Sequence, residues 1–483
     1  MTTPITRRRF LQGAALAALT ATVGATIQPV TPARSIYTAG NEFLDIDPNT
    51  SVWVGTLPAY QPKPALQRAV TADLAIVGGG FSGVSTAYHF SRRYPGKRVV
   101  LLEARSLANG ASGRSGGQML NWISGMDDDP EMIRHVYRTT RAAIDTILEI
   151  IDRHALPVSY RRDGILHVQT SAQSAETAHA EVERLNELGI PLQYLRGAEL
   201  AARVDLRGAQ GAIFDPSEGQ INGAEYVRGL RSVLIRQGVE LYEDTPVLQI
   251  REGRTIMLTT PGAEVQAQAI VLATNAYTRQ LGYFRSAIFP MICHVAATRP
   301  LSAAEQEQVG WHAAAGWGDD FQKLLYVART GDGRIVFGGG PAGYEYLYDN
   351  RTSYAGDLSP TAQSSQRMRQ TLAGYLPGAA ALPITHRWSG PVAINLNGLS
   401  GLIGVRGDHR NVFYALGYSG HGVVLANLAG RILTDMFSGD DQPWRILPIV
   451  QPSPAPIPPE PLRWLGAQLY MGIVGSSRRG RLW

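Results

Sequence analysis

Three glycines and one acidic residue have the spacing of a dinucleotide-binding site. Gly78, Gly80 and Gly83 form the pattern G-x-G-x-x-G, and Glu103 follows 20 residues after the last of them. The first glycine permits a tight turn, the second lets the backbone approach a pyrophosphate, and the third lets a helix pack closely on a strand. An acid at this distance accepts hydrogen bonds from ribose hydroxyls. The four residues predict a bound dinucleotide, but they do not distinguish FAD from NAD.

The segments around these glycines have the order that such a site requires. Residues 72–77 form a short apolar run with β-branched side chains, which predicts a buried parallel strand. Residues 81–93 predict an amphipathic helix, and residues 98–102 predict a second strand that ends at Glu103. The start of the helix would present N–H groups and partial positive charge to the phosphates. The alternative, a glycine-rich turn of an unrelated α/β protein, does not explain strand, helix and acid together.

A second glycine-rich loop follows the acid after seven residues. Residues 110–118 read Gly-Ala-Ser-Gly-Arg-Ser-Gly-Gly-Gln, a loop able to wrap a long dinucleotide. Together with residues 99–105, this loop resembles the glycine/D-amino-acid oxidase superfamily of FAD enzymes, and most of all its gamma-glutamylputrescine oxidase-like branch. Further segments extend the resemblance over most of the chain: residues 51–53, 238–247, 270–276, 333–339 and 411–423.

The resemblance implies FAD as the cofactor and an α/β fold, in which a mixed-sheet substrate-binding domain is inserted into a Rossmann-like FAD-binding domain. It also implies which residues contact the cofactor, with the valine of the 238–247 segment holding the adenine. The FAD-binding residues implied in this way are Gly78, Gly80, Phe81, Ser82, Gly83, Glu103, Ala104, Arg105, Ser112, Gly113, Arg114, Ser115, Gly116, Gly117, Gln118, Val247, Thr274, Gly420, His421, Gly422 and Val423. No metal-ligand cluster is expected.

The same resemblance divides the chain into alternating parts of two domains. The FAD-binding domain is expected at residues 40–150, 216–290 and 386–447, the substrate domain at 151–215 and 291–385, and a Pro-rich C-terminal tail at 448–483. In the tail, an apolar-leaning stretch of about thirteen residues from Leu462 to Val474 is too short to span a membrane as a helix. We expect it to pack on the body of the protein, with surface attachment through Arg478, Arg479 and Arg481 as the alternative.

The chemistry implied by a flavin is oxidation of the C–N bond of a small amine or amino-acid derivative. A hydride passes from the carbon that bears nitrogen to the flavin, and water hydrolyses the resulting imine. This route requires no dedicated base, so the candidates for catalytic residues are few: His421, Arg329 and Tyr326. His421 would hydrogen-bond the flavin or tune substrate protonation, or else it is satisfied by the backbone.

Arg329 would meet a substrate carboxylate, or it pairs within the substrate-domain sheet. Tyr326 and Trp388 would form walls of the substrate cavity, although aromatic residues are more often core. Cys293 is the only cysteine, which excludes an internal disulfide. A covalent flavin linkage through Cys293 is one interpretation, and a buried inert thiol is the favoured one.

One departure from the family pattern bears on the substrate. Amino-acid oxidases of this superfamily carry an arginine for the substrate carboxylate in a turn before the last flavin motif. The matching residues here, 388–393, contain no arginine, and residues 397–404 lack the usual Asp and Pro. We therefore expect an amine, a polyamine derivative or an N-substituted compound rather than a simple α-amino acid.

The N-terminus resembles a twin-arginine export signal. Arg7 and Arg8 precede a weakly hydrophobic run over residues 13–24, and cleavage after Ala25 would end a signal peptide of residues 1–25. We therefore expect the twin-arginine export machinery as a partner and a periplasmic or secreted location. That machinery carries folded proteins, which suits an enzyme that binds its cofactor before export. A basic N-terminus on an ordinary helix is the alternative.

The overall composition limits the other partners. Arg7, Arg8 and Arg9 supply three of the formal net charge of +5, and no dense basic stripe remains elsewhere, so no nucleic acid is expected. We expect a small-molecule amine as substrate, and either oxygen or a membrane electron carrier as acceptor. Two other functions stay open: C–O oxidation on the same fold, and FAD-stabilised binding without turnover.

Overall fold

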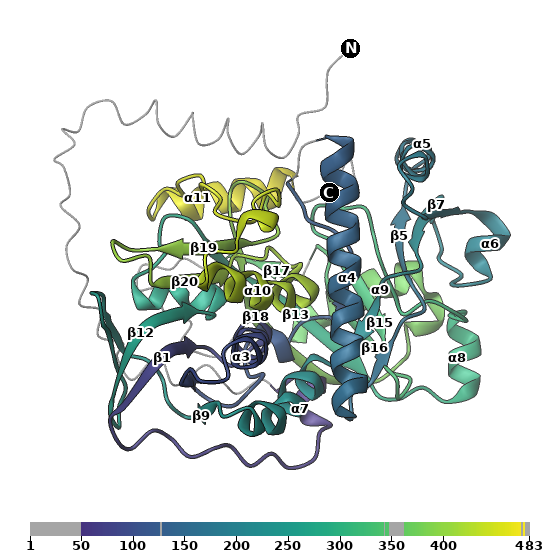
Figure 1. The fold of residues 1–483 in the computed structure, drawn as a ribbon. Helices are drawn as coiled ribbons and strands as arrows, with labels where there is room; N and C mark the ends of the chain where they lie inside the picture. The colour runs from purple at the N-terminus through teal and green to yellow at the C-terminus, as the bar shows by residue number, and fades with distance from the viewer. Residues whose placement is uncertain (1–49, 126–127, 342, 347–361, 475–476, 479–483) are drawn as a thin grey trace.

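The computed structural model describes residues 50–125, 128–341, 343–346, 362–474 and 477–478 (Figure 1). The expected signal peptide, residues 1–25, lies outside the described residues, as do Arg479 and Arg481 of the C-terminal tail. The described chain forms two large sheets and one small sheet, with helices packed around them.

The first large sheet has eight strands and a parallel centre. Strand β1 pairs in parallel with β2 on one side and with β12 on the other, and β12 pairs in parallel with β20. The strands of this sheet are β1 (Val70–Val77), β2 (Val99–Leu102), β9 (Glu240–Tyr242), β10 (Gln249–Arg251), β11 (Ile256–Thr259), β12 (Glu264–Leu272), β19 (Leu402–Arg406) and β20 (Val412–Leu416). The strands β2 and β20 are buried along their whole length, as expected for a parallel sheet that is covered on both faces.

Helices α3 (Phe81–Arg93) and α10 (Gly422–Phe437) lie against each other beside this sheet, and α7 (Gly223–Arg236) packs on α3. Gly430 permits the contact between α3 and α10, because a Cβ at this position would overlap the backbone of Ser85 and Thr86. The long helix α4 (Pro130–His154) begins at Asp129, whose carboxylate accepts from the Met132 N–H, and runs between the two halves of the molecule (Figure 1).

The second large sheet has nine strands in mixed orientation. Its longest pairing is antiparallel, between β13 and β18, and β5 lies parallel to β14. The strands are β5 (Ile165–Gln169), β6 (Gln193–Leu195), β7 (Gly211–Asp215), β13 (Phe289–Thr298), β14 (Gly316–Gly318), β15 (Leu325–Arg329), β16 (Ile335–Gly339), β17 (Tyr344–Glu345) and β18 (Ile384–Ile394). A separate apolar cluster, which includes Trp317 and Phe337, packs on this sheet.

The remaining elements connect and cover the two large sheets. The small sheet consists of β3 (Gln118–Met119), β8 (Gly219–Ile221) and β4 (Tyr160–Arg161). The other helices are α2 (Val52–Gly55), α5 (Ala172–Glu187), α6 (Gly197–Ala201), α8 (Ala303–Val309), α9 (Ala362–Tyr375) and α11 (Leu462–Leu469). Short turns of helix are η2 (Ala111–Gly113), η3 (Asn275–Leu281), η4 (Pro377–Ala379), η5 (Gln442–Trp444) and η6 (Tyr470–Val474).

The predicted fold class is confirmed: the chain is an α/β protein with a Rossmann-like parallel sheet and a second, mixed sheet. The domain boundary expected at residue 386 falls inside β18, which continues as part of the mixed sheet to Ile394. The tail expected at residues 448–483 contains helix α11, whose Ala467 packs with Met291 of β13 and Tyr346 (Figure 1).

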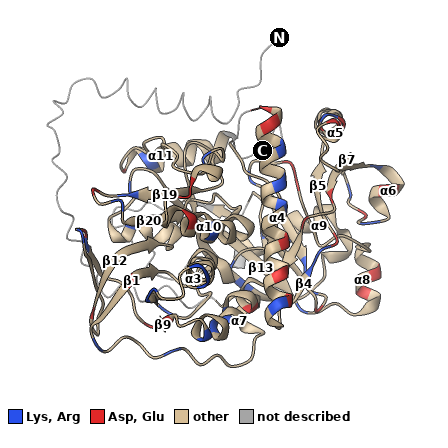
Figure 2. Ribbon diagram, in the orientation of Figure 1, with Lys and Arg blue, Asp and Glu red and all other residues tan. Residues whose placement is uncertain are grey.

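Charged side chains of both signs are interspersed over the described part of the chain, and the ribbon shows no face of one colour (Figure 2). Within the described residues, no helix is both long and apolar enough to cross a membrane. No cluster of three or more His, Cys, Asp or Glu residues capable of holding a metal ion occurs in the same part of the chain.

Candidate active site

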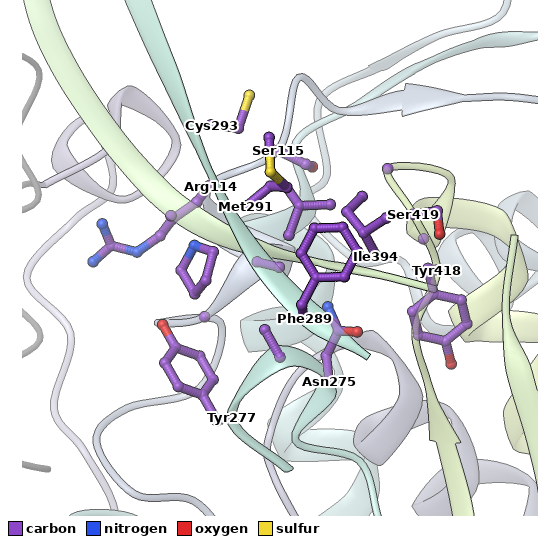
Figure 3. A pocket seen from close by; sticks show the side chains of 18 of the residues that line it. Arg114, Ser115, Asn275, Tyr277, Phe289, Met291, Cys293, Ile394, Tyr418 and Ser419 are labelled. Carbon is purple, nitrogen blue, oxygen red and sulfur yellow. The ribbon is translucent and has the colours of Figure 1, made fainter. Parts of the chain in front are cut away.

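A cavity of about 730 Å³ lies between the two large sheets. It is lined by the turn after β1, the loop 103–118, the segment after β12, the strands β13, β15 and β18, the start of α10, and α11. Figure 3 shows side chains from several of these segments around the same space. All of the expected FAD-binding residues line this cavity except Gly83 and Gly113.

The turn after β1 is shaped by its glycines. Gly78 has a φ of 109°, and a Cβ at this position would lie 2.7 Å from the carbonyl oxygen of Ala273. A Cβ on Gly83 would overlap the carbonyl oxygen of Gly78, so Gly83 packs α3 onto the turn and does not line the cavity. Gly80 is the N-cap residue of α3 and lines the cavity, so the N-terminus of this helix opens toward the site expected for a pyrophosphate.

Glu103 follows β2 directly and lies beside this turn. One carboxylate oxygen accepts the Gly79 N–H at 2.6 Å, and the other accepts the Arg105 N–H at 3.0 Å. Burial raises the pKa of Glu103 to about 7, although the bonds from Arg105 and Gly79 act in the opposite direction. The carboxylate lines the cavity where a ribose hydroxyl could donate to it.

The glycine-rich loop 110–118 forms the next part of the lining. The Ser112 hydroxyl accepts the Phe81 N–H at 2.8 Å, and the Arg114 guanidinium donates to the Asn109 and Ser389 carbonyl oxygens. Gly116 borders the ring of Tyr326, which would lie 2.7 Å from a Cβ at this position. Gly113 does not line the cavity, because it packs against the backbone of Ala108 instead. Small residues at most positions of the loop thus let much of its backbone lie against the cavity.

The start of α10 completes this half of the cavity. Gly420 has a φ of 96°, and a Cβ there would meet open space, whereas His421 is the N-cap residue of the helix. Gly422 and Val423 also line the cavity. The partial positive charge of the helix start is thereby directed at the space beside loop 110–118.

The other half of the cavity has apolar walls. Phe289, Met291, Cys293 and Val295 alternate along β13 and all line the cavity, because every second side chain of a strand points to the same face. Ile394 of the adjacent strand β18 lies close to Phe289 and Met291 (Figure 3). This surface fits the carbon skeleton of a substrate better than a second nucleotide.

Tyr326 and Cys293 meet within this apolar half. The Tyr326 hydroxyl and the Cys293 sulfur lie 3.4 Å apart, and both side chains line the cavity. Burial raises the pKa of Tyr326 well above its ordinary value and that of Cys293 to about 11. Both groups are therefore neutral at pH 7, and Tyr326 lies where its role as a wall of the substrate cavity requires.

Arg329 and Trp388 do not line the cavity, so their expected contacts with substrate are corrected. The Arg329 guanidinium donates to the Trp311 carbonyl oxygen at 2.7 Å and to the side chain of Gln306 in α8, which ties β15 to α8 and the segment after it. Trp388 is fully buried and donates its indole N–H to the Arg114 carbonyl oxygen at 2.8 Å. Trp388 therefore fixes the loop that carries Arg114 instead of facing a ligand.

Sequence reasoning missed a wall formed by the C-terminal residues. Leu462, Leu465 and Leu469 of α11 line the cavity, and Arg463 anchors the helix through Glu460, whose carboxylate lies 2.8 Å from the guanidinium. The spacing of these three leucines along one helical face was a usable signal, but nothing local indicated what the face covers. Asn275, Tyr277 and Tyr418 were also missed, and they line the cavity from two other segments (Figure 3).

A parallel sheet with a glycine-rich first turn, a ribose-binding acid and a flanking apolar chamber defines a dinucleotide-dependent oxidoreductase. The residues fit FAD, because one cavity is lined by the turn after β1, by loop 110–118 and by the start of α10, which together can hold the two nucleotides and the flavin ring. The chain belongs to the family described as DAO, FAD dependent oxidoreductase, which matches residues 73–436. It is an FAD-dependent enzyme of the amine or amino-acid oxidase type.

Individual relatives agree with this family assignment. The chain is 27% identical over 393 residues to the probable oxidoreductase OrdL of Haemophilus influenzae, which covers 78% of this chain and 86% of that protein. It is 27% identical over 402 residues to the gamma-glutamylputrescine oxidoreductase of Escherichia coli, which covers 81% and 89% respectively. The crystal structure of glycine oxidase from Geobacillus kaustophilus has the same fold, with a TM-score of 0.67 at 20% identity over 79% of this chain and 98% of that chain.

Proposed function

We propose that this protein is an exported enzyme that oxidises the C–N bond of a small amine or amino-acid derivative by removing a hydride from the carbon next to nitrogen. The observation that carries the proposal is the continuity of the cavity. Its glycine-lined half suits a dinucleotide, and its apolar half opens directly beside loop 110–118. When bound, FAD supplies the acceptor for the electron pair that leaves the substrate.

The residues of the chain position the cofactor and the substrate and enclose both from water. Glu103 and the turn at Gly78 hold the nucleotide end, while the start of α10 stabilises negative charge at the opposite end of the cofactor site. Tyr326, Phe289 and Met291 exclude water and orient the substrate carbon. His421, the N-cap residue of α10, also lines the cavity and would exchange a proton with a bound amine.

Two observations support an amine over a simple α-amino acid. One is the similarity to the relative named gamma-glutamylputrescine oxidoreductase, whose substrate is a polyamine derivative, although another relative is named glycine oxidase. From residues 388–393, only Gly390, Pro391 and Val392 line the cavity, so this segment offers a substrate carboxylate no guanidinium. An amine whose reacting carbon lies against the apolar wall fits both observations.

The visible spectrum of the purified holoenzyme tests the proposal. Anaerobic addition of a panel of amines, amino acids and matched alcohols should bleach the flavin band with at least one amine. Bleaching by alcohols alone would favour C–O oxidation on this fold. A yellow protein that no compound bleaches would indicate binding without turnover.

The export signal and the electron acceptor need separate tests. The pair Arg7 and Arg8 followed by a weakly apolar run supports twin-arginine export to the periplasm or the medium. A double variant, R7K/R8K, should retain the protein in the cytoplasmic fraction, whereas the unchanged chain should leave it. Reoxidation of the reduced enzyme by oxygen, compared with a soluble quinone, distinguishes the two acceptors.

A further inference from the structure

Lysine is rare in this protein, and one of its lysines lines the cavity. Only three of the 45 Lys and Arg residues of the chain are lysines, namely Lys63, Lys97 and Lys323. Lys97 forms an exposed ion pair with Asp73, and Lys63 lies away from the cavity lining. Lys323 is half-buried in the turn between β14 and β15 and lines the cavity.

The other cations of the lining already have tasks. Arg114 donates to backbone carbonyl oxygens, and Arg463 is paired with Glu460. Arg105 lies next to Glu103, where the ribose and phosphates of the dinucleotide are expected. Lys323 has no hydrogen bond or ion pair with any residue that the structure describes, and Glu103 is the only acidic residue among the described lining residues. Within the described part of the chain, the Lys323 ammonium therefore has no protein partner, and its residue lines the cavity.

A series of contacts along the apolar half connects the glycine-rich loop with the turn that carries Lys323. From Gly116 the wall continues through Tyr326 to Cys293, and Cys293 pairs in register with Tyr344. The Tyr344 hydroxyl in turn donates to the Leu324 carbonyl oxygen at 3.3 Å, next to Lys323. On the other side, the Gln322 N–H donates to the Ser477 carbonyl oxygen at 2.9 Å, which fixes the turn to the C-terminal segment.

We propose that Lys323 binds a carboxylate at the end of the substrate remote from the oxidised C–N bond, so that the preferred substrates are amines with a distal carboxylate. This inference rests on the proposed function and specifies its substrate class. Apolar walls between the two ends fit a methylene chain, and one unpaired cation balances one negative charge, which favours a monoanion over a phosphate. Lys323 would act as a specificity-determining residue, since it contacts the substrate away from the reacting atoms.

The electrostatics of Lys323 agree with this role. Burial lowers the pKa of the Lys323 ammonium below its ordinary value of 10.5, with no acidic neighbour to raise it. A bound carboxylate would raise that pKa again, so the affinity for anionic amines should fall once the pH exceeds the pKa of Lys323 in the free enzyme.

A labelling experiment tests the site without turnover. Reductive methylation of the holoenzyme, read by peptide mass spectrometry, reports Lys63, Lys97 and Lys323 in the same sample. Pentanoate should reduce methylation of Lys323 several-fold relative to Lys97, and the neutral match pentanamide should not. Equal protection by both compounds, or none by either, would overturn the proposal.

A kinetic experiment tests the substrate class. For the wild type, 5-aminopentanoate should have a higher kcat/KM than 5-aminopentanamide. In Lys323→Met the ratio of the two values should fall by about tenfold, the loss expected for one partly solvated charge-assisted hydrogen bond, and Lys323→Arg should restore part of it. Lys97→Met is the matched control outside the cavity, and its ratio should equal that of the wild type.

The two proposals fail in distinguishable ways. If no amine bleaches the flavin, the proposed function fails, while protection of Lys323 by pentanoate still reports on the anion site. If neutral amines are oxidised as well as their anionic matches, the proposed function holds and the role of Lys323 is wrong. A Lys323→Met variant that alters only the reoxidation of the flavin would also overturn it, because a substrate anchor acts on KM.

Discussion

The guanidinium of Arg329 lies outside the cavity lining, although the sequence suggested that it meets a substrate carboxylate. Because it donates to the Trp311 carbonyl oxygen and to Gln306 of helix α8, we expect Arg329→Met to destabilise the protein by about 1.5–3 kcal/mol, the range for a hydrogen bond to a charged group. The loss should appear as a lower Tm, with KM for the substrate unchanged. A raised KM at an unchanged Tm would instead return Arg329 to the substrate site.

At the same scale, Glu103 should make FAD binding dependent on pH. The pKa of Glu103 in the free protein, about 7, lies above the value of 4.5 for an exposed side chain. Folding therefore favours the protonated carboxyl group. The stability that this protonated group contributes is lost as the pH rises from about 4.5 to 7. A ribose hydroxyl donates to the ionised form, so FAD affinity should increase as the pH rises toward 7. Titration of the apoprotein with FAD at about pH 5.5 and at about pH 8.5, on either side of that pKa, measures the effect.

The control for this titration is Glu103→Gln, which keeps the shape of the side chain and removes its ionisation. The variant should bind FAD more weakly and with little dependence on pH over the same range. If its pH dependence equalled that of the wild type, another group would be responsible for it.

At the scale of elements, the crossing of α3 and α10 depends on Gly430. A methyl group there would overlap the backbone of Ser85 and Thr86, so Gly430→Ala should force the helices apart and cost about 1–3 kcal/mol in the free energy of unfolding. Chemical denaturation monitored by circular dichroism measures this cost. The matched control is Gly374→Ala in α9, where a Cβ meets open space and the change should stabilise by at most about 1 kcal/mol.

Sequence patterns predicted the elements of the first βαβ unit because their signals are local. The predicted helix over residues 81–93 is α3 itself, bounded by Gly80 at its start. The strand predicted at 72–77 begins two residues earlier, because Val70 and Thr71 are already paired with β12. Such an extension depends on a partner almost 200 residues away, which no local pattern indicates.

The candidate site was predictable to a similar extent. The glycine-rich segments that line the cofactor half carry a local signal, because a turn with positive φ or a close approach of the backbone requires glycine. The apolar half was not predictable, because Phe289, Met291 and Ile394 come together only through the pairing of β13 with β18. Their alternation is typical of any half-buried strand, and nothing in it distinguishes a cavity wall from core.

At the scale of the whole molecule, FAD should stabilise the protein without a covalent bond. The cavity lies between the two large sheets, so bound FAD contacts elements from both, and the Tm of the holoprotein should exceed that of the apoprotein by an amount that grows with FAD concentration. Cys293 is an unsuitable nucleophile, since burial raises the pKa of its thiol to about 11.

Acid precipitation checks the absence of a covalent bond. All flavin absorbance should remain in the supernatant, and Cys293→Ser should behave in the same way as the wild type. A yellow pellet from the wild type together with a colourless pellet from Cys293→Ser would show linkage through this cysteine.

Helix α11 has a consequence for the order of events during synthesis. The lining segments occur along the chain from Val77 to Met471, and α11 follows all the segments contributed by the two large sheets. A nascent chain that has not yet reached Leu462 can form both sheets and the glycine-rich turns, but its cavity still lacks one wall. Enclosure of a cofactor is therefore a late step in biogenesis, and its timing is set by the position of one short helix in the sequence.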